Sequence, residues 1–366
     1  MFHNHYNTTP WFSVDMGEDL LRRNYDALLP DEAQLCKDEI VGRLDFVREG
    51  QLPPASLDGL VEIKRVAKVA RHLLGCDPDT FDGLTSILYH LEVYGISIAK
   101  QLQDDGDDHL RITRTAAHLQ NEACNVAMIL SRNDRAWLEL AYRHVMQSAY
   151  ATIDSEHDYA AHRFLRAAGI AALQGSLANQ YENSKRAFET ADDPDVMRSA
   201  ILDEIKAAES GFKQSESLKW AARLYDSVQT AIAQGYLPAE EQQERLLAVS
   251  RRAHELTGQT SWAEAWYDCA KMLTQQPTFD RYLELAEASL ALHNSTNSVR
   301  HLERRYKHLL SAINTGGVPY ARLCETMQTA INTAWAISLR HHKKRWQKKA
   351  DSCFRKLAEQ SDSAQR

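Results

Sequence analysis

Residues 215–293 carry one pattern twice: Trp220–Asp226 reads WAARLYD, and Trp262–Asp268 reads WAEAWYD, 42 residues later. Each copy contains Trp-Ala, two variable residues, a large apolar residue and Tyr-Asp, and each precedes a second segment with helical apolar spacing. Pairs of helices with a period of about 40 residues are typical of α-solenoids. The repeat therefore predicts stacked helical hairpins.

The repeated aromatic residues have a structural and a functional interpretation. Tryptophan and tyrosine spaced four to five residues apart on a helix pack against neighbouring helices, and this is the role that we expect. A weaker copy, Trp137–Tyr142, precedes Trp220, and Trp335 begins a partial copy that is out of phase. The alternative is an aromatic cage for a ligand.

Composition favours helices throughout the chain. Only 15 glycines and 9 prolines occur in 366 residues, whereas β-proteins need turns about every 8–12 residues. Apolar residues recur at helical spacing from Asp15 onward, and no segment predicts a strand. We predict an all-α protein: an α-solenoid of stacked antiparallel helical hairpins, with an N-terminal helical bundle and a long C-terminal helix.

The expected organisation has five parts. They are an N-terminal arm (1–14), a helical bundle (15–103), an acidic linker (104–109), a helical-repeat solenoid (110–316) and a long basic C-terminal helix with a tail (317–366), whose helix we expect over 318–358. The linker contains Asp104–Asp108, DDGDD, which lacks the closing glutamate of an EF-hand. We interpret it as a solvated loop that caps the next helix.

One segment resembles a known repeat family. Ala167–Gly175 (AAGIAALQG), followed by Tyr181, Phe188 and Pro194, resembles a degenerate tetratricopeptide repeat. A HEAT-like array fits the 42-residue period equally well. By this resemblance the chain is a module that binds a protein or peptide partner. In outline alone, it is also similar to the Rap-type peptide-responsive regulators of bacteria.

Several function classes are disfavoured by composition. The net charge of −7 gives no general reason to expect nucleic acid. Six separated cysteines without a C-x-x-C pair indicate reduced thiols. The N-terminus lacks a signal-peptide pattern, and no apolar run is long enough to span a membrane. We expect a cytoplasmic protein that does not contact membranes.

The 15 histidines do not form a metal-site pattern. His118 and Glu122 are four residues apart, and His157 and His162 flank another helical turn, but two ligands do not make a site. Neither E-x-x-H nor H-E-x-x-H spacing is present. We therefore expect no metal and no cofactor.

An enzymatic alternative depends on one pair of residues. Arg111 and His118, separated by six residues, resemble the loose R-x4-6-H motif of the HEPN ribonucleases, which are all-α proteins. That resemblance implies metal-independent RNA cleavage by the two side chains. Arg65 and His72 have the same spacing, and the residue after each arginine is apolar, where that family prefers a polar one.

The C-terminal region contains a basic cluster with no acidic residue inside it. A helix C-terminus rich in cations is favourable for the helix dipole and for solubility. The functional interpretation is a binding site for an acidic partner or for nucleic acid. The cluster consists of Arg340, Lys343, Lys344, Arg345, Lys348 and Lys349.

These observations favour a non-enzymatic adaptor, scaffold or ligand-sensing regulator. It would bind a protein or peptide through the helical-repeat surface, with the basic C-terminal helix as a secondary contact. One alternative is a nucleic-acid-handling protein, including a HEPN-like ribonuclease. Another is a structural subunit of a larger assembly that forms homo-oligomers through its terminal helix.

Overall fold

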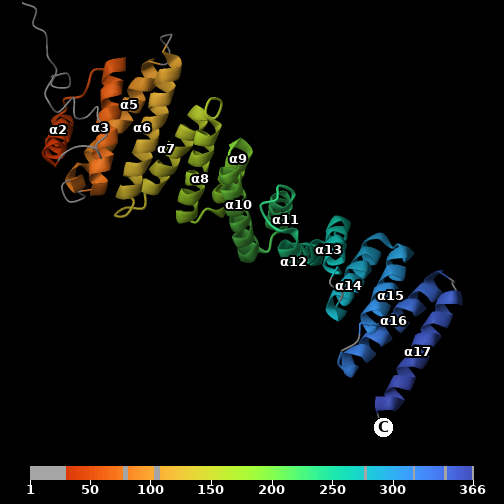
Figure 1. Cartoon of the computed structure of the whole chain (residues 1–366). Coiled ribbons are helices and arrows are strands. Elements are labelled where there is room, and N and C mark those ends of the chain that lie inside the picture. Colours follow the sequence, from red (N-terminus) through yellow and green to blue (C-terminus); the bar gives the residue numbers. More distant parts are fainter. Residues whose placement is uncertain are drawn as a thin grey trace, which may run out of the picture. The chain divides into compact units, whose positions relative to one another are not determined.

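The computed structural model describes residues 30–76, 81–102, 108–275, 278–315, 318–341 and 344–364. Within these ranges the regular elements are all helices, and no strand occurs (Figure 1). The predicted all-α fold of stacked hairpins is thus confirmed. The expected N-terminal arm (1–14) and residues 103–107 of the expected linker lie outside the described residues, so the linker stays a prediction.

The chain divides into two compact units, Met1–Ala207 and Ala208–Arg366. In the first unit each helix packs against the next, and fully buried Ile63, Leu91 and Leu119 contribute to a core that extends from Cys36 to Ile170. Its helices are α2 (Pro30–Arg48), α3 (Leu57–Cys76), the short 3-10 helix η3 (Asp82–Leu84), α5 (Thr85–Leu102), α6 (His109–Leu130), α7 (Trp137–Thr152), α8 (His157–Leu173) and α9 (Leu177–Thr190). Helix α10 (Pro194–Ser215) contains the division between the units.

Small residues allow the helices to approach closely. In α8, Ala160, Ala161, Ala167 and Ala168 are fully buried. A Cβ atom at Gly95 would lie only 2.8 Å from Leu119 Cδ1, so a larger side chain does not fit there. Close packing of this kind makes the helix stack sensitive to changes of a single methyl group.

The second unit continues the hairpin pattern. Consecutive helices pack against each other, and two of them end in residues with positive φ, Gly258 (65°) and Asn297 (53°), which is the common C-terminal arrangement. The helices are α11 (Leu218–Ala233), α12 (Ala239–Thr257), α13 (Thr260–Leu273), α14 (Phe279–Thr296), α15 (Val299–Ile313), α16 (Tyr320–His341) and α17 (Lys344–Ala364).

The repeated aromatic residues pack between helices, as the sequence predicts. Tyr225 of α11 meets Trp262 of α13 edge to face, with ring centroids 5.6 Å apart. Trp266 is 6% exposed, and its Nε1 donates a hydrogen bond to Glu284 of α14 at 2.7 Å. In the earlier copy, Trp137 packs against Tyr89 of α5 at 4.9 Å. The packing interpretation is confirmed at these positions.

The single C-terminal helix predicted over 318–358 is wrong. The region forms two helices, α16 and α17, which pack against each other. Trp346, Ala350 and Cys353 make one apolar face of α17, and Trp346 meets Tyr306 of α15 edge to face at 5.0 Å. A straight continuation of α16 would carry this face away from α15 and leave it in water, so burial favours the hairpin.

A pair of glycines tests how tightly the helices pack. A Cβ atom at Gly211 of α10 would lie 2.3 Å from Trp220 Cδ2, whereas a Cβ atom at Gly169 of α8 would meet no atom of another helix within 4 Å. We expect Gly211→Ala to destabilise the protein by about 1–3 kcal/mol through overpacking. Gly169→Ala should stabilise it by about 0.5–1 kcal/mol, because alanine favours a helix interior. Urea unfolding measures both, and equal effects of the two substitutions would contradict the packing described.

Candidate functional site

The predicted basic cluster lies mainly on α17. Lys344, Arg345, Lys348 and Lys349 are exposed there. Arg345 pairs with Glu303 of α15 at 3.4 Å, and Lys349 Nζ lies 4.0 Å from the centroid of the Trp346 ring. Arg340 is near the end of α16, with its side chain outside the description, and Lys343 lies outside the described residues.

Helix α15 adds cations that the sequence analysis did not select. Arg300, Arg304 and Lys307 are exposed and share one face of the helix, because they are spaced four and three residues apart. The opposite face buries Leu302 and Tyr306. A search for basic residues at helical spacing, instead of a continuous cluster, would have found these three.

Helices α15 and α17 are joined directly by the contact of Tyr306 with Trp346 and by the ion pair of Glu303 with Arg345. We therefore treat the exposed cations of these two contacting helices together, as one candidate surface. We call it the α15–α17 basic surface, and it consists of Arg300, Arg304, Lys307, Lys344, Arg345, Lys348 and Lys349.

Little of the positive charge on this surface is neutralised within the described part of the chain. There, Arg345 is the one member that forms an ion pair. Arg304 instead lies over the Tyr267 ring of α13, 5.5 Å from its centroid. Burial lowers the pKa of His308, and the nearby Arg304 and Lys307 lower it further. Protonation of its imidazole, which would add another positive charge, is therefore disfavoured.

The aromatic rings beneath the surface are buried. Tyr306 is 3% exposed and Trp346 is 2% exposed, and burial with a hydrogen bond to Cys353 raises the pKa of the Tyr306 phenol. These rings support the cations, but they are not available for stacking against a ligand. The surface can therefore attract anionic groups electrostatically, without stacking on these two rings.

The second predicted pair, Arg111 and His118, lies on α6 in the first unit. Arg111 is exposed, but the His118 side chain is only 26% exposed, with Nε2 3.9 Å from Glu122 Oε1. Glu122 is itself buried and paired with Arg71 of α3. The structure thus places the pair on one helix without bringing a hydrogen-bond partner to His118 Nε2 within the described residues.

Burial and nearby cations lower the pKa of His118 to about 4. Desolvation is the largest cause, followed by Lys64, Arg71, Lys68 and Arg163. His118 is therefore uncharged at neutral pH. In the other predicted pair, Arg65 is held by Glu62 at 2.8 Å. Catalysis by Arg111 and His118 stays a prediction of the HEPN resemblance.

Among the residues that the structure describes, no group of three or more potential metal ligands comes together. His157 of the second histidine pair is hydrogen-bonded to Asp192, at 3.0 Å, and His162 is exposed. In the same ranges, no helix combines the length and apolarity needed to cross a bilayer.

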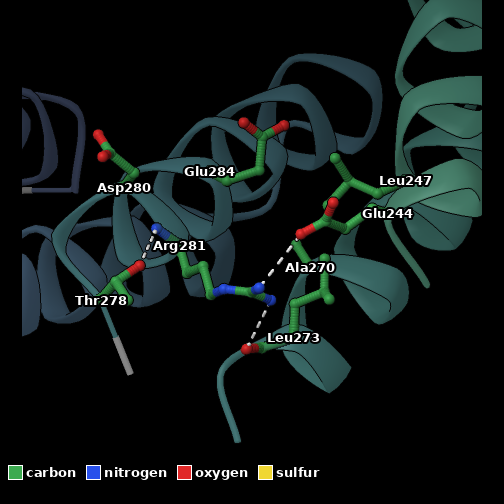
Figure 2. Close-up of a pocket in the computed structure, with 8 residues that line it drawn as sticks. All are labelled: Glu244, Leu247, Ala270, Leu273, Thr278, Asp280, Arg281 and Glu284. Carbon is green, nitrogen blue, oxygen red and sulfur yellow. Dashed lines mark hydrogen bonds and ion pairs between the residues drawn. The ribbon is translucent and has the colours of Figure 1, made fainter. Parts of the chain in front are cut away.

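A pocket of 370 Å³ lies in the second unit, lined by residues of α12, α13 and α14 (Figure 2). Its Arg281 donates to the carbonyl of Leu273 at 3.0 Å and pairs with Glu244 at 3.2 Å, as Figure 2 shows. Glu284 accepts the Trp266 hydrogen bond and pairs with Arg251 at 3.4 Å. These polar groups connect the helices to one another, which is a structural role.

Comparisons with known proteins leave the function open. No protein-family model matches the chain, and no curated protein has a matching sequence. A de novo designed helical repeat protein is 16% identical, with 74% of this chain and 98% of that chain covered and a TM-score of 0.21. A circular tandem repeat protein with a novel repeat topology is 13% identical, with 96% and 98% covered and a TM-score of 0.25.

A third solved structure is a signal transduction ATPase with numerous domains that has a tetratricopeptide repeat sensor, from Pyrococcus horikoshii. It is 14% identical, covers 84% of this chain, and has a TM-score of 0.24. The chain spans 47% of that protein. At such TM-scores none of the three carries an argument about function.

The low pKa of His118 predicts an acid-sensitive first unit. Because the pKa is about 4 in the folded chain and 6.5 for an unperturbed histidine, the unfolded chain binds more protons between these values. The free energy of unfolding should therefore fall as the pH is lowered, by on the order of 2 kcal/mol from His118 between pH 7 and about pH 5.

Urea unfolding of the parent chain and of His118→Gln at both pH values measures this effect. His144, whose pKa burial also lowers to about 4, is present in both proteins and contributes equally. The variant should lose less stability on acidification than the parent. An identical loss in the two proteins would show that His118 is not shielded as described.

Proposed function

We propose that the chain is a non-enzymatic adaptor that binds an acidic segment of a protein partner on the α15–α17 basic surface. A helical-repeat fold supports a scaffold or adaptor role in general terms. The observation that carries the specific proposal is the row of exposed cations on two packed helices, most of them without an ion pair within the described chain.

The arrangement of charge on this surface would favour an anionic ligand. Arg300 and Lys307 lie on the face of α15 opposite its core, and Lys348 is exposed on α17. Like charges held on adjacent rigid helices repel one another, and an anionic ligand relieves this repulsion. Each exposed ion pair contributes up to about 1 kcal/mol, so several contacts give moderate, salt-sensitive binding.

An acidic protein segment fits this surface better than nucleic acid. Single-stranded nucleic acids gain affinity by stacking bases on exposed aromatic rings, whereas Tyr306 and Trp346 are buried. The net charge of −7 also opposes a long phosphate backbone that passes beyond the basic surface. A short acidic segment avoids that repulsion because it contacts the basic surface alone.

Charge reversal tests the proposal. The triple variant Arg300→Glu, Lys307→Glu, Lys348→Glu should bind a labelled poly-glutamate peptide at least about tenfold more weakly, which corresponds to about 1.4 kcal/mol. The matched control reverses Arg132, Arg198 and Lys206, which are also exposed and unpaired within the described residues and give the same change in net charge. Fluorescence anisotropy measures both affinities.

The control should bind like the parent chain. Equal weakening of the two triple variants would mean that binding follows net charge and not this surface, contradicting the proposal. Competition with single-stranded RNA tests the nucleic-acid alternative. That alternative would be favoured if RNA displaced the peptide from the parent chain and bound more weakly to the Arg300→Glu, Lys307→Glu, Lys348→Glu variant. The alternative of a structural subunit predicts a mass that rises with protein concentration.

A further inference from the structure

A second group of cations surrounds a pocket in the first unit, between α3 and the beginning of α6. The pocket has a volume of 490 Å³. It is lined by Val61, Lys64, Asp108, Leu110, Arg111, Arg114 and Thr115. Three of these side chains are cationic and one is a carboxylate, so the lining has an excess of positive charge.

Two of the cations have no counterion in the described part of the chain. Lys64 of α3 and Arg111 of α6 form no ion pair there. Burial lowers the pKa of Lys64, and repulsion by Lys68 and Arg111 lowers it further. Because Lys64 and Arg111 line the same pocket, an anion bound there would relieve the repulsion between them.

The third cation is held in position. Arg114 Nε pairs with Glu156 of the α7–α8 connection at 2.7 Å, while the side chain is 53% exposed. Because one edge of a guanidinium carries only part of its donors, the remaining N–H groups stay free to bind an anion. The charge of Arg114 is balanced by Glu156, so its contribution to the pocket is a set of oriented hydrogen-bond donors.

The beginning of α6 contributes further donors. Asp108 occupies the N-cap position, but its side chain makes no capping hydrogen bond. The first N–H groups of a helix have no partner inside the helix, and the dipole favours an anion at this end. The carboxylate of Asp108 opposes that preference, so the ligand must carry enough charge to overcome it.

A hydroxyl group also lines the pocket. Thr115 is 4% exposed as a residue and comes from the second turn of α6. Its hydroxyl can donate a hydrogen bond to a ligand oxygen.

We propose that this pocket binds the dianionic phosphoryl group of a phosphate monoester. A phosphoryl group has three strong acceptor oxygens and nearly two negative charges at neutral pH. Lys64 and Arg111 supply the charge, and Thr115 with the α6 N–H groups supplies donors. A single carboxylate would gain less, since Asp108 offsets one of the two unpaired cations. This site is separate from the α15–α17 basic surface and does not depend on its function.

The remainder of the ligand has an apolar wall beside it. Val61 and Leu110 line the pocket, and Leu110 is 52% exposed. The volume is larger than a phosphoryl group needs, so the ester part can lie against these side chains. Such an ester is either a phosphorylated residue of a protein segment or a small phosphate-bearing metabolite.

Isothermal titration with a phosphoserine peptide, its unphosphorylated form, and glycerol phosphate tests the site in the full-length chain. We expect Lys64→Gln and Arg111→Gln each to weaken phosphate-ester binding about tenfold or more. Asp108→Asn should tighten binding, because it removes the opposing charge. Lys100→Gln, which removes an exposed cation of α5 outside the pocket, is the control and should change nothing.

The two ligand sources give different results. Tighter binding of the phosphopeptide than of glycerol phosphate indicates a phosphorylated segment, and equal binding indicates a small ester. The proposal is overturned if neither phosphate compound binds, if the unphosphorylated peptide binds as well, or if Asp108→Asn weakens binding. Circular dichroism confirms that each variant is folded, so a loss of binding reports on the pocket.

Discussion

The edge-to-face contact between aromatic rings of alternate helices is the interaction on which the second unit depends. Tyr225 of α11 meets Trp262 of α13, and Tyr306 of α15 meets Trp346 of α17. An aromatic pair adds about 0.5–1.5 kcal/mol beyond the area that it buries, and its geometry is specific. These pairs therefore fix the axial register between one helical hairpin and the next.

That register determines which surface residues of neighbouring hairpins meet. Glu303 and Arg345, 42 residues apart, form an ion pair beside the contact of Tyr306 with Trp346. Asp280 and Arg322 are also 42 residues apart and paired. The contact of Tyr306 with Trp346 consequently places α17 beside α15, so a packing requirement inside the unit brings two helices with exposed cations together.

The sequence predicted the hairpins and the packing role of the tryptophans, because both follow from local spacing. It did not predict the break between α16 and α17, since His341–Lys343 contains neither glycine nor proline. The break depends on the burial of Trp346 against Tyr306, a contact between distant residues. The low pKa of His118 likewise depends first on burial and then on cations such as Lys64 and Arg163, which come from two other helices. The spacing of residues along one helix does not reveal which residues of other helices will pack against it.

Zero-length carbodiimide cross-linking of poly-glutamate to the chain tests the central claim most directly, because it joins carboxylates only to lysines that they touch. The account predicts that mass spectrometry will find cross-links concentrated on Lys307, Lys344, Lys348 and Lys349, with few at Lys206, which is also exposed but lies outside this surface. Cross-links distributed over all exposed lysines alike would contradict a binding role for the surface that α15 and α17 form.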